Sequence, residues 1–128
     1  MRTTDYAKGI VFGLLASVNK PKYLTTKPDS KIHQEYIVIN SLPINADVMQ
    51  KCIINVNYHV KDIEPGMEDT IRLEAGSQVV LDILEHVTFS ENGITKYMID
   101  FESQETIPEL SLDEHFSNLR FSFKLINN

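Results

Sequence analysis

Apolar and polar residues alternate along residues 52–61, which read CIINVNYHVK. After Ile53, the polar positions are Asn55, Asn57, His59 and Lys61, and each follows an apolar residue. Alternation with a period of two is typical of a strand that buries one face and leaves the other in water. We therefore predict a strand over residues 52–62.

Three further segments have strand character. The C-terminal segment 115–127 alternates apolar Leu119, Phe121, Phe123 and Leu125 with polar Arg120, Ser122 and Lys124. The run YIVIN at 36–40 is short and rich in β-branched residues. Asn92-Gly93 lies between VTFSE and ITKYMIDFE, and Asn-Gly between two such runs is a strong hairpin signal.

The first of two segments with helical spacing lies near the N-terminus. Its apolar residues recur every four positions after a Thr3 or Thr4 cap: Tyr6, Ile10, Leu14 and Val18. We predict that this helix ends near Asn19, because Pro21 disfavours helical geometry in the residue before it.

The second helix is predicted over residues 69–86. The face expected to pack on the sheet carries Ile71, Ala75, Val79, Ile83 and Val87, with Val80 and Leu84 beside them. Gly76 lies inside this helix, where glycine costs about 1 kcal/mol relative to alanine. We interpret Gly76 as a position that permits close packing of the helix on the sheet.

The remaining segments are predicted to be irregular. Residues 20–34 form a long polar loop, Pro65 and Gly66 mark a turn, and a polar linker surrounds Pro108. A turn is also predicted at Pro43, followed by a helical turn that begins at Asn45.

These elements predict one α+β domain over residues 1–128, with a mostly antiparallel sheet of about four to five strands and two amphipathic helices packed on one face. The other face of the sheet is then polar. It carries the candidate interaction residues Asn55, Asn57, His59, Lys61, Asp100, Arg120 and Lys124.

Composition and charge exclude several classes of function. The formal net charge of -6 opposes a general nucleic-acid binder, because phosphate binding relies on clustered Lys and Arg. Cys52 is the single cysteine, which excludes an internal disulfide and a cysteine-based zinc cage, and its place on the apolar side of a strand indicates a buried thiol. Asp5 and Lys8 lie close before the apolar run at 9–18, and no clear small-residue cleavage site follows it, so we expect an intracellular protein without a membrane span.

No catalytic or metal-binding motif stands out. The four histidines are spread one to a segment without a close ligand pair, and nucleophile-elbow, phosphate-loop and dinucleotide signatures are absent from the sequence. His59 beside Asn55 and Asn57 is a conceivable general base, but a lone histidine on a wet strand face is more often solvated or at an interface. The acid pair Asp113-Glu114 is interpreted as turn charge. We expect a protein that is not an enzyme and needs no cofactor or metal.

The loop 20–34 is the most basic part of the chain. Lys20, Lys22, Tyr23, Lys27 and Lys31 make it a candidate docking loop. Contact with phosphate is one interpretation, but a solvated loop is the simpler one, because only one aromatic accompanies the lysines.

The order of these segments resembles the tail-terminator (tail completion) proteins of long-tailed bacteriophages, including prophage-encoded members. The resemblance spans nearly the whole chain: an N-terminal helix and long loop, then HQEYIVINSLP, CIINVNYHVKD, TIRLEAGSQVVLDILEHV, FSENGITKYMIDFE and HFSNLRFSFKLIN. It rests on element order, because none of these segments is a diagnostic motif. The length of the 20–34 loop and the linker near Pro108 are departures from the family pattern.

The resemblance implies a structural role in the virion neck, with assembly in the cytoplasm of the bacterial host. Such proteins form a hexameric ring that caps the tail tube, stops its polymerisation and meets the head-side connector, while DNA passes through without specific binding. The polar face would then be an interface or lumen surface, and the lysine-rich loop a docking element.

Other functions remain open at this point. A small acidic binding module, similar to an immunity or antitoxin protein, would use clustered Asp and Glu against a basic partner, and the densest acidic run here is DIEPGMED. Another head–tail joining or minor tail protein would have a similar build. A compact α+β enzyme is the third alternative, and the motif search disfavours it.

Overall fold

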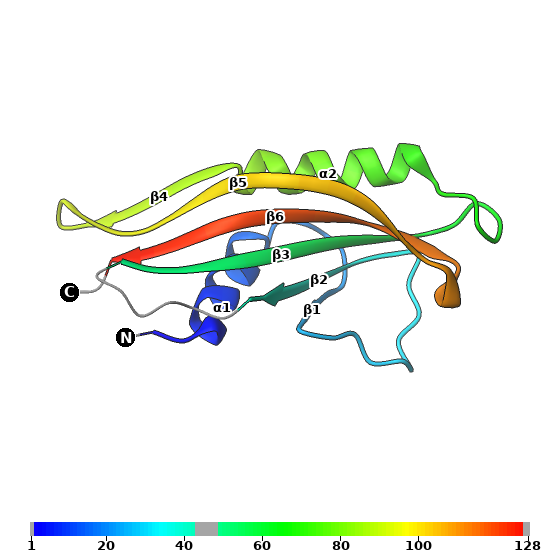
Figure 1. Cartoon of the computed structure of the whole chain (residues 1–128), viewed down its shortest axis with the longest axis horizontal. Coiled ribbons are helices and arrows are strands. Elements are labelled where there is room, and N and C mark those ends of the chain that lie inside the picture. Colours follow the sequence, from blue (N-terminus) through cyan, green and yellow to red (C-terminus); the bar gives the residue numbers. More distant parts are fainter. Residues whose placement is uncertain (1, 43–48, 127–128) are drawn as a thin grey trace.

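The computed structural model of this chain describes residues 2–42 and 49–126. In chain order the elements are α1 (Thr4–Leu14), β1 (Lys22–Leu24), β2 (Glu35–Ser41), β3 (Met49–Lys61), α2 (Thr70–Leu84), β4 (His86–Glu91), β5 (Ile94–Glu109), the 3-10 helix η1 (Leu110–Leu112) and β6 (Glu114–Ile126). The strands form one six-stranded sheet in the order β1-β2-β3-β6-β5-β4 (Figure 1). Every neighbouring pair is antiparallel except β1 and β2, so the predicted α+β fold with a mostly antiparallel sheet is confirmed.

Both helices pack on one face of the curled sheet, as predicted. Val11 of α1 and Val80 of α2 belong to the same buried cluster. The residues that β3 contributes to this cluster occupy alternate positions and therefore share one face: Cys52, Ile54, Val56, Tyr58 and Val60. We call the opposite side of the sheet the polar face.

β1 lies inside the segment that the sequence pattern predicts to be a loop. The Ile37 backbone N–H donates to Pro21 O (2.9 Å), and the Thr25 N–H donates to Ile39 O (2.8 Å), so the chain is held parallel to β2. A three-residue strand is too short to show alternation, which explains why the pattern does not reveal it. The predicted turn at Pro43 and Asn45 lies outside the described residues.

α1 is shorter than predicted. Thr3 caps it as expected, since its side chain accepts a hydrogen bond from the backbone of the first turn, but the helix ends at Leu14 instead of continuing to Asn19. A hydrogen-bonded turn follows, and it buries Leu15 and Val18. The predicted apolar stripe therefore reaches the core without a longer helix.

The predicted packing face of α2 is correct only in part: Val80 and Leu84 are buried and Ile83 and Val87 pack against the core, but Ile71, Ala75 and Val79 are exposed. The residues it buries are Leu73, Gly76, Val80 and Leu84, whereas Ile71 is 82% exposed and Val79 is 45% exposed. The helix carries two apolar stripes, and the stripe that contains Gly76 can approach the sheet more closely. Tertiary packing selects this stripe because contact between helix and sheet improves as their separation falls.

The interpretation of Gly76 is confirmed. A Cβ atom added to Gly76 would lie 2.2 Å from Cε1 of Tyr58 on β3, a separation that real Cβ atoms do not reach. Only glycine lets the α2 backbone approach the Tyr58 ring this closely.

The predicted linker at Pro108 is wrong, because Pro108 lies in β5, where it pairs in register with His115 of β6. Pairing between β4 and β5 stops at His86 and Asp100, so within the described residues the later part of β5 has a partner strand on only one side. Proline is tolerated at such an edge because its missing N–H is not needed by a neighbour.

The hairpin at Asn92-Gly93 is confirmed. Both residues have positive φ, 53° and 76°, and β4 and β5 pair directly on either side of them, from Glu91 and Ile94. Positive φ at both central positions is the conformation of a type I′ turn, which Asn-Gly favours.

Candidate functional site

The strand register places the predicted interaction residues on the polar face. Across β3 and β6, Asn55 is opposite Arg120 and Asn57 is opposite Asn118. The seven candidates do not form one continuous group, however. They divide into an asparagine cluster, a cluster around Glu114, and a peripheral pair.

The asparagine cluster consists of Asn40, Asn55, Asn57 and Asn118. Asn118 Nδ2 donates to Asn57 Oδ1 (2.6 Å) and Asn55 Oδ1 (3.2 Å), while Asn55 Nδ2 donates to Asn40 Oδ1 (3.0 Å). The amides thus bridge β2, β3 and β6. Arg120 Nε joins them by donating to Asn55 Oδ1 at 3.4 Å.

The Glu114 cluster consists of Tyr36, His59, Lys61 and Glu114. The Tyr36 hydroxyl donates to Glu114 Oε1 (2.6 Å), and His59 Nδ1 lies 3.2 Å from the same oxygen. Lys61 Nζ is 3.7 Å from Glu114 Oε2. The side chain of Glu114 is 3% exposed, so it is a buried carboxylate and not the turn charge predicted from the sequence.

Ring stacking fixes the orientation of His59 in this cluster. Its ring lies between those of Tyr36 and Phe116, with centroid distances of 4.5 and 4.6 Å. A histidine held on both faces and bound to a carboxylate is a structural link between strands.

Two groups of the Glu114 cluster have shifted pKa values. Burial acts to raise the pKa of Glu114, but hydrogen bonds from His59 and Tyr36 and the nearby Lys61 charge outweigh it and lower the pKa. Burial, then the hydrogen bond to Glu114, raises the pKa of the Tyr36 hydroxyl. The carboxylate is therefore the charged partner and the phenol the neutral donor.

Asp100 and Lys124 form the peripheral part of the predicted surface. Asp100 Oδ1 lies 2.7 Å from Nδ1 of His86 on β4. Lys124 is opposite Lys51 in the register and lines a hollow of about 380 Å³ with Ser122 and Glu102.

Most of the predicted docking loop is occupied by contacts within the chain. Lys22 Nζ donates to Val18 O (2.7 Å), and Lys20 Nζ lies 3.4 Å from Glu35 Oε2. The Tyr23 hydroxyl is hydrogen-bonded to His33 Nε2, and Lys27 Nζ lies 5.3 Å from the centre of the Tyr36 ring. Lys31 is exposed.

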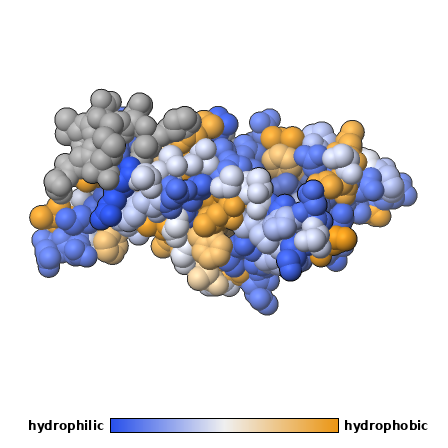
Figure 2. Space-filling model, turned by 90° about the horizontal axis from the view of Figure 1, so that it is seen from below, coloured by the Kyte–Doolittle hydropathy of each residue, from blue (hydrophilic) through white to orange (hydrophobic). Residues whose placement is uncertain are grey.

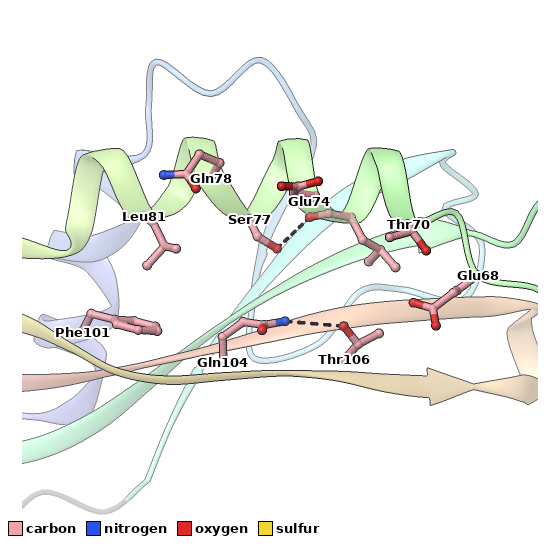
Figure 3. A pocket seen from close by; sticks show the side chains of 10 residues that line it. Glu68, Thr70, Glu74, Ser77, Gln78, Leu81, Phe101, Gln104 and Thr106 are labelled. Atoms are coloured by element: carbon pink, nitrogen blue, oxygen red, sulfur yellow. Dashed lines mark hydrogen bonds between the residues drawn. The ribbon is translucent and has the colours of Figure 1, made fainter.

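A groove of about 480 Å³ lies between α2 and β5, away from every residue that the sequence singled out as a site (Figure 3). Leu73, Leu81 and Phe101 provide its apolar part, and Glu68 and Glu74 provide acidic groups from the α2 side. Ser77, Gln78 and Gln104 are among its polar lining, and Ser77 Oγ donates to Leu73 O (2.7 Å). We call this the α2–β5 groove.

Sequence reasoning missed Tyr36, Phe116 and Asn118. Phe116 and Asn118 share the alternation of Arg120, which places them on the polar side of β6. The aromatic Phe116 at a strand position on the polar side could therefore have indicated a stacked partner of His59. The role of Glu114 had no local signal, because its partners are 55 and 78 residues away along the chain.

The polar groups of these clusters are bound to one another. In residues 2–42 and 49–126, every buried side-chain nitrogen or oxygen has a hydrogen-bond partner. Over the same ranges, no group of three or more His, Cys, Asp or Glu side chains is placed to hold a metal. The arrangement joins β2, β3 and β6 rigidly, since each buried polar group is held in place by a neighbour.

None of the helices in the described residues is both long enough and apolar enough to cross a membrane. Viewed from below, the surface shows separate hydrophobic spots among polar atoms instead of one continuous apolar patch (Figure 2). A protein that docks through this side would therefore combine small apolar contacts with polar ones.

A scan against protein-family models and a search of curated proteins found no match to this sequence.

Proposed function

We propose that this chain is a structural protein of a bacteriophage tail, similar to the tail terminators, that forms a ring on the tail tube and joins it to the head-side connector. The observation that carries the proposal is the polar face, the side of the sheet opposite the helix-packed core, whose side chains are fixed by mutual hydrogen bonds. The order of helices and strands along the chain, which underlies the resemblance, is a second support.

A scaffold role suits the chemistry of the polar face better than catalysis does. The most reactive group there, His59, is stacked between two rings and bound to Glu114. A general base needs an open side toward substrate and a proton to accept from it. The His59 contacts serve instead to join β2, β3 and β6.

The proposal assigns the polar face to a subunit contact or to the ring lumen. Charges of both signs lie along this face: Lys51, Lys124 and Glu102 share one hollow, while Lys61, Glu105 and Glu109 lie toward the other end. A face with charges of both signs suits weak association between identical subunits, and salt weakens such contacts.

The test is the molar mass in solution, measured by light scattering over a concentration series at low and moderate salt. We expect a mass that rises from the 14.6 kDa monomer toward six times that value as concentration increases. Moderate salt should shift the rise to higher concentration. A monomer under every condition would reject a self-assembling ring.

A second candidate function is favoured by the acids of the α2–β5 groove. Glu68 and Glu74 both line the groove. An acidic binding module of the immunity or antitoxin type would present such a surface to a basic partner. Persistent monomers that bind a basic protein through this groove would support it over the ring.

A further inference from the structure

The two most exposed large apolar side chains in the described residues lie on different sides of the molecule. Ile71 of α2 is 82% exposed, and Ile32 in the connection between β1 and β2 is 80% exposed. In Figure 1, α2 runs alongside β5 near one edge of the sheet, and this connection lies at the opposite edge, next to β1. A single exposed apolar side chain is common on protein surfaces, so each of these residues is informative only together with its neighbours.

The α2 side combines an apolar stripe with acidic neighbours. Ile71, Ala75 and Val79 are four residues apart and exposed, so they form a stripe along the outer side of the helix. Glu74 lies beside this stripe and lines the α2–β5 groove together with Glu68. The surface therefore offers an apolar strip with negative charge along it.

The loop side combines an apolar tip with a basic neighbour. Lys31 and Ile32 are adjacent and exposed. The turn that carries them is already closed, because the Lys31 N–H donates to Pro28 O (3.0 Å) and Lys27 Nζ donates to the carbonyls of Pro28 and Lys31. A preformed turn loses little conformational entropy when it docks.

We propose that the outer side of α2 and the 27–32 turn are the two halves of one contact between copies of this chain. In this contact Ile32 packs on the Ile71, Ala75 and Val79 stripe of the next copy, and Lys31 faces Glu74. Charge complementarity between Glu74 and Lys31 supports a second copy of this chain as the partner. Arg72, next to Ile71, is already paired with Asp69 and Glu35, and the turn carries the exposed acid Asp29 between Lys27 and Lys31. The inference rests on the proposed ring and names the surfaces that would close it.

Two different patches on one chain make a head-to-tail contact, which generates a ring when the rotation closes. A single turn on a helix is a small interface, so each contact is weak alone and assembly depends on concentration. Addition of a strand from another copy to the free edge of β5 is disfavoured as an alternative. This edge has a register shift between Phe101 and Ser103, and it also carries Pro108 and several acidic residues. All three features oppose pairing at a sheet edge.

Disulfide trapping tests the contact directly. The native Cys52 is buried, and burial raises its pKa to about 11, so the native thiol does not compete. A double variant with Ile32→Cys and Ala75→Cys should give, on mild oxidation, a ladder of covalent oligomers on a non-reducing gel. The matched control, Ile32→Cys with Glu91→Cys at the exposed end of β4, should give at least tenfold less ladder; equal ladders would overturn the contact.

A charge exchange supplies the second test. Lys31→Glu and Glu74→Lys should each raise the concentration needed for half-assembly several-fold, and the double variant should restore it toward the wild-type value. If the wild-type chain assembles but neither single change affects it, the contact is wrong and the ring survives. If the wild-type chain never assembles and the double-cysteine variant gives no ladder, both the contact and the ring are wrong.

Discussion

Glu114 is a buried, charged residue whose hydrogen-bond partners are distant along the chain. Its carboxylate is held by Tyr36 from β2 and by His59 and Lys61 from β3, and almost none of its side chain reaches solvent. Removing one partner of a buried, hydrogen-bonded charge leaves the other groups without compensation. This residue should therefore contribute to the stability of the fold more than any exposed acid.

We predict that Glu114→Gln lowers the free energy of unfolding by about 2 kcal/mol near neutral pH, because hydrogen bonds to a charged group are worth about 1.5–3 kcal/mol each. Urea unfolding followed by circular dichroism measures the loss. Glu91→Gln, at the exposed end of β4, is the matched control and should change the free energy of unfolding by less than about 0.5 kcal/mol.

The stability difference between wild type and Glu114→Gln should depend on pH. The folded-state pKa of Glu114 is lowered, so the unfolded chain takes up this proton first as the pH falls. The stabilisation is complete above the ordinary glutamate pKa of about 4.3 and is lost as the pH falls through the folded value. The difference between wild type and Glu114→Gln should thus shrink in urea titrations as the pH falls below the ordinary glutamate pKa, and a difference that grows there would contradict the assignment.

Gly76 gives a prediction with an internal control. Gly76→Ala should destabilise the fold by about 1–3 kcal/mol, because the added methyl group overlaps the Tyr58 ring and this overpacking exceeds the gain in helix propensity. Gly9→Ala, in α1 with no atom near the new Cβ, should stabilise by about 0.5–1 kcal/mol. Thermal and urea unfolding of the two variants should move in opposite directions.

At the scale of elements, the β4–β5 hairpin depends on its turn. Gly93→Ala forces a Cβ into a positive-φ position and should cost about 1 kcal/mol. Asn92→Gly keeps a residue that accepts positive φ and should remain within about 0.5 kcal/mol of wild type. Urea midpoints compare the two, and equal losses would show that the turn does not set the hairpin conformation.

Some elements could be predicted from the sequence pattern, and others could not. The hairpin and the β3 strand were predictable because turn chemistry and alternation are local properties. The packing face of α2 was not, since Ile71 and Leu73 belong to two apolar stripes that are equally visible in sequence. Contact with Tyr58 decides between the stripes, and that contact joins residues far apart in the chain.

At the scale of the whole molecule, the strand order determines which surfaces exist. β6 lies between β3 and β5, so the last strand in sequence is central in the sheet and joins the hairpin to the rest. This order brings Arg120 and Asn118 against the β3 amides. It also leaves α2 and the 25–34 connection on separate sides, as a head-to-tail assembly requires (Figure 1).

The sequence by itself determined the class of fold, the hairpin, the close approach at Gly76 and the polar character of one sheet face. These features follow from period, turn residues and side-chain size, which act over a few neighbouring residues. Tertiary structure alone decided the burial of Glu114, the stacking of His59, the exposed stripe of α2 and the place of Pro108 within β5. Each of these depends on partners that only the strand order brings together, and no local pattern encodes that order.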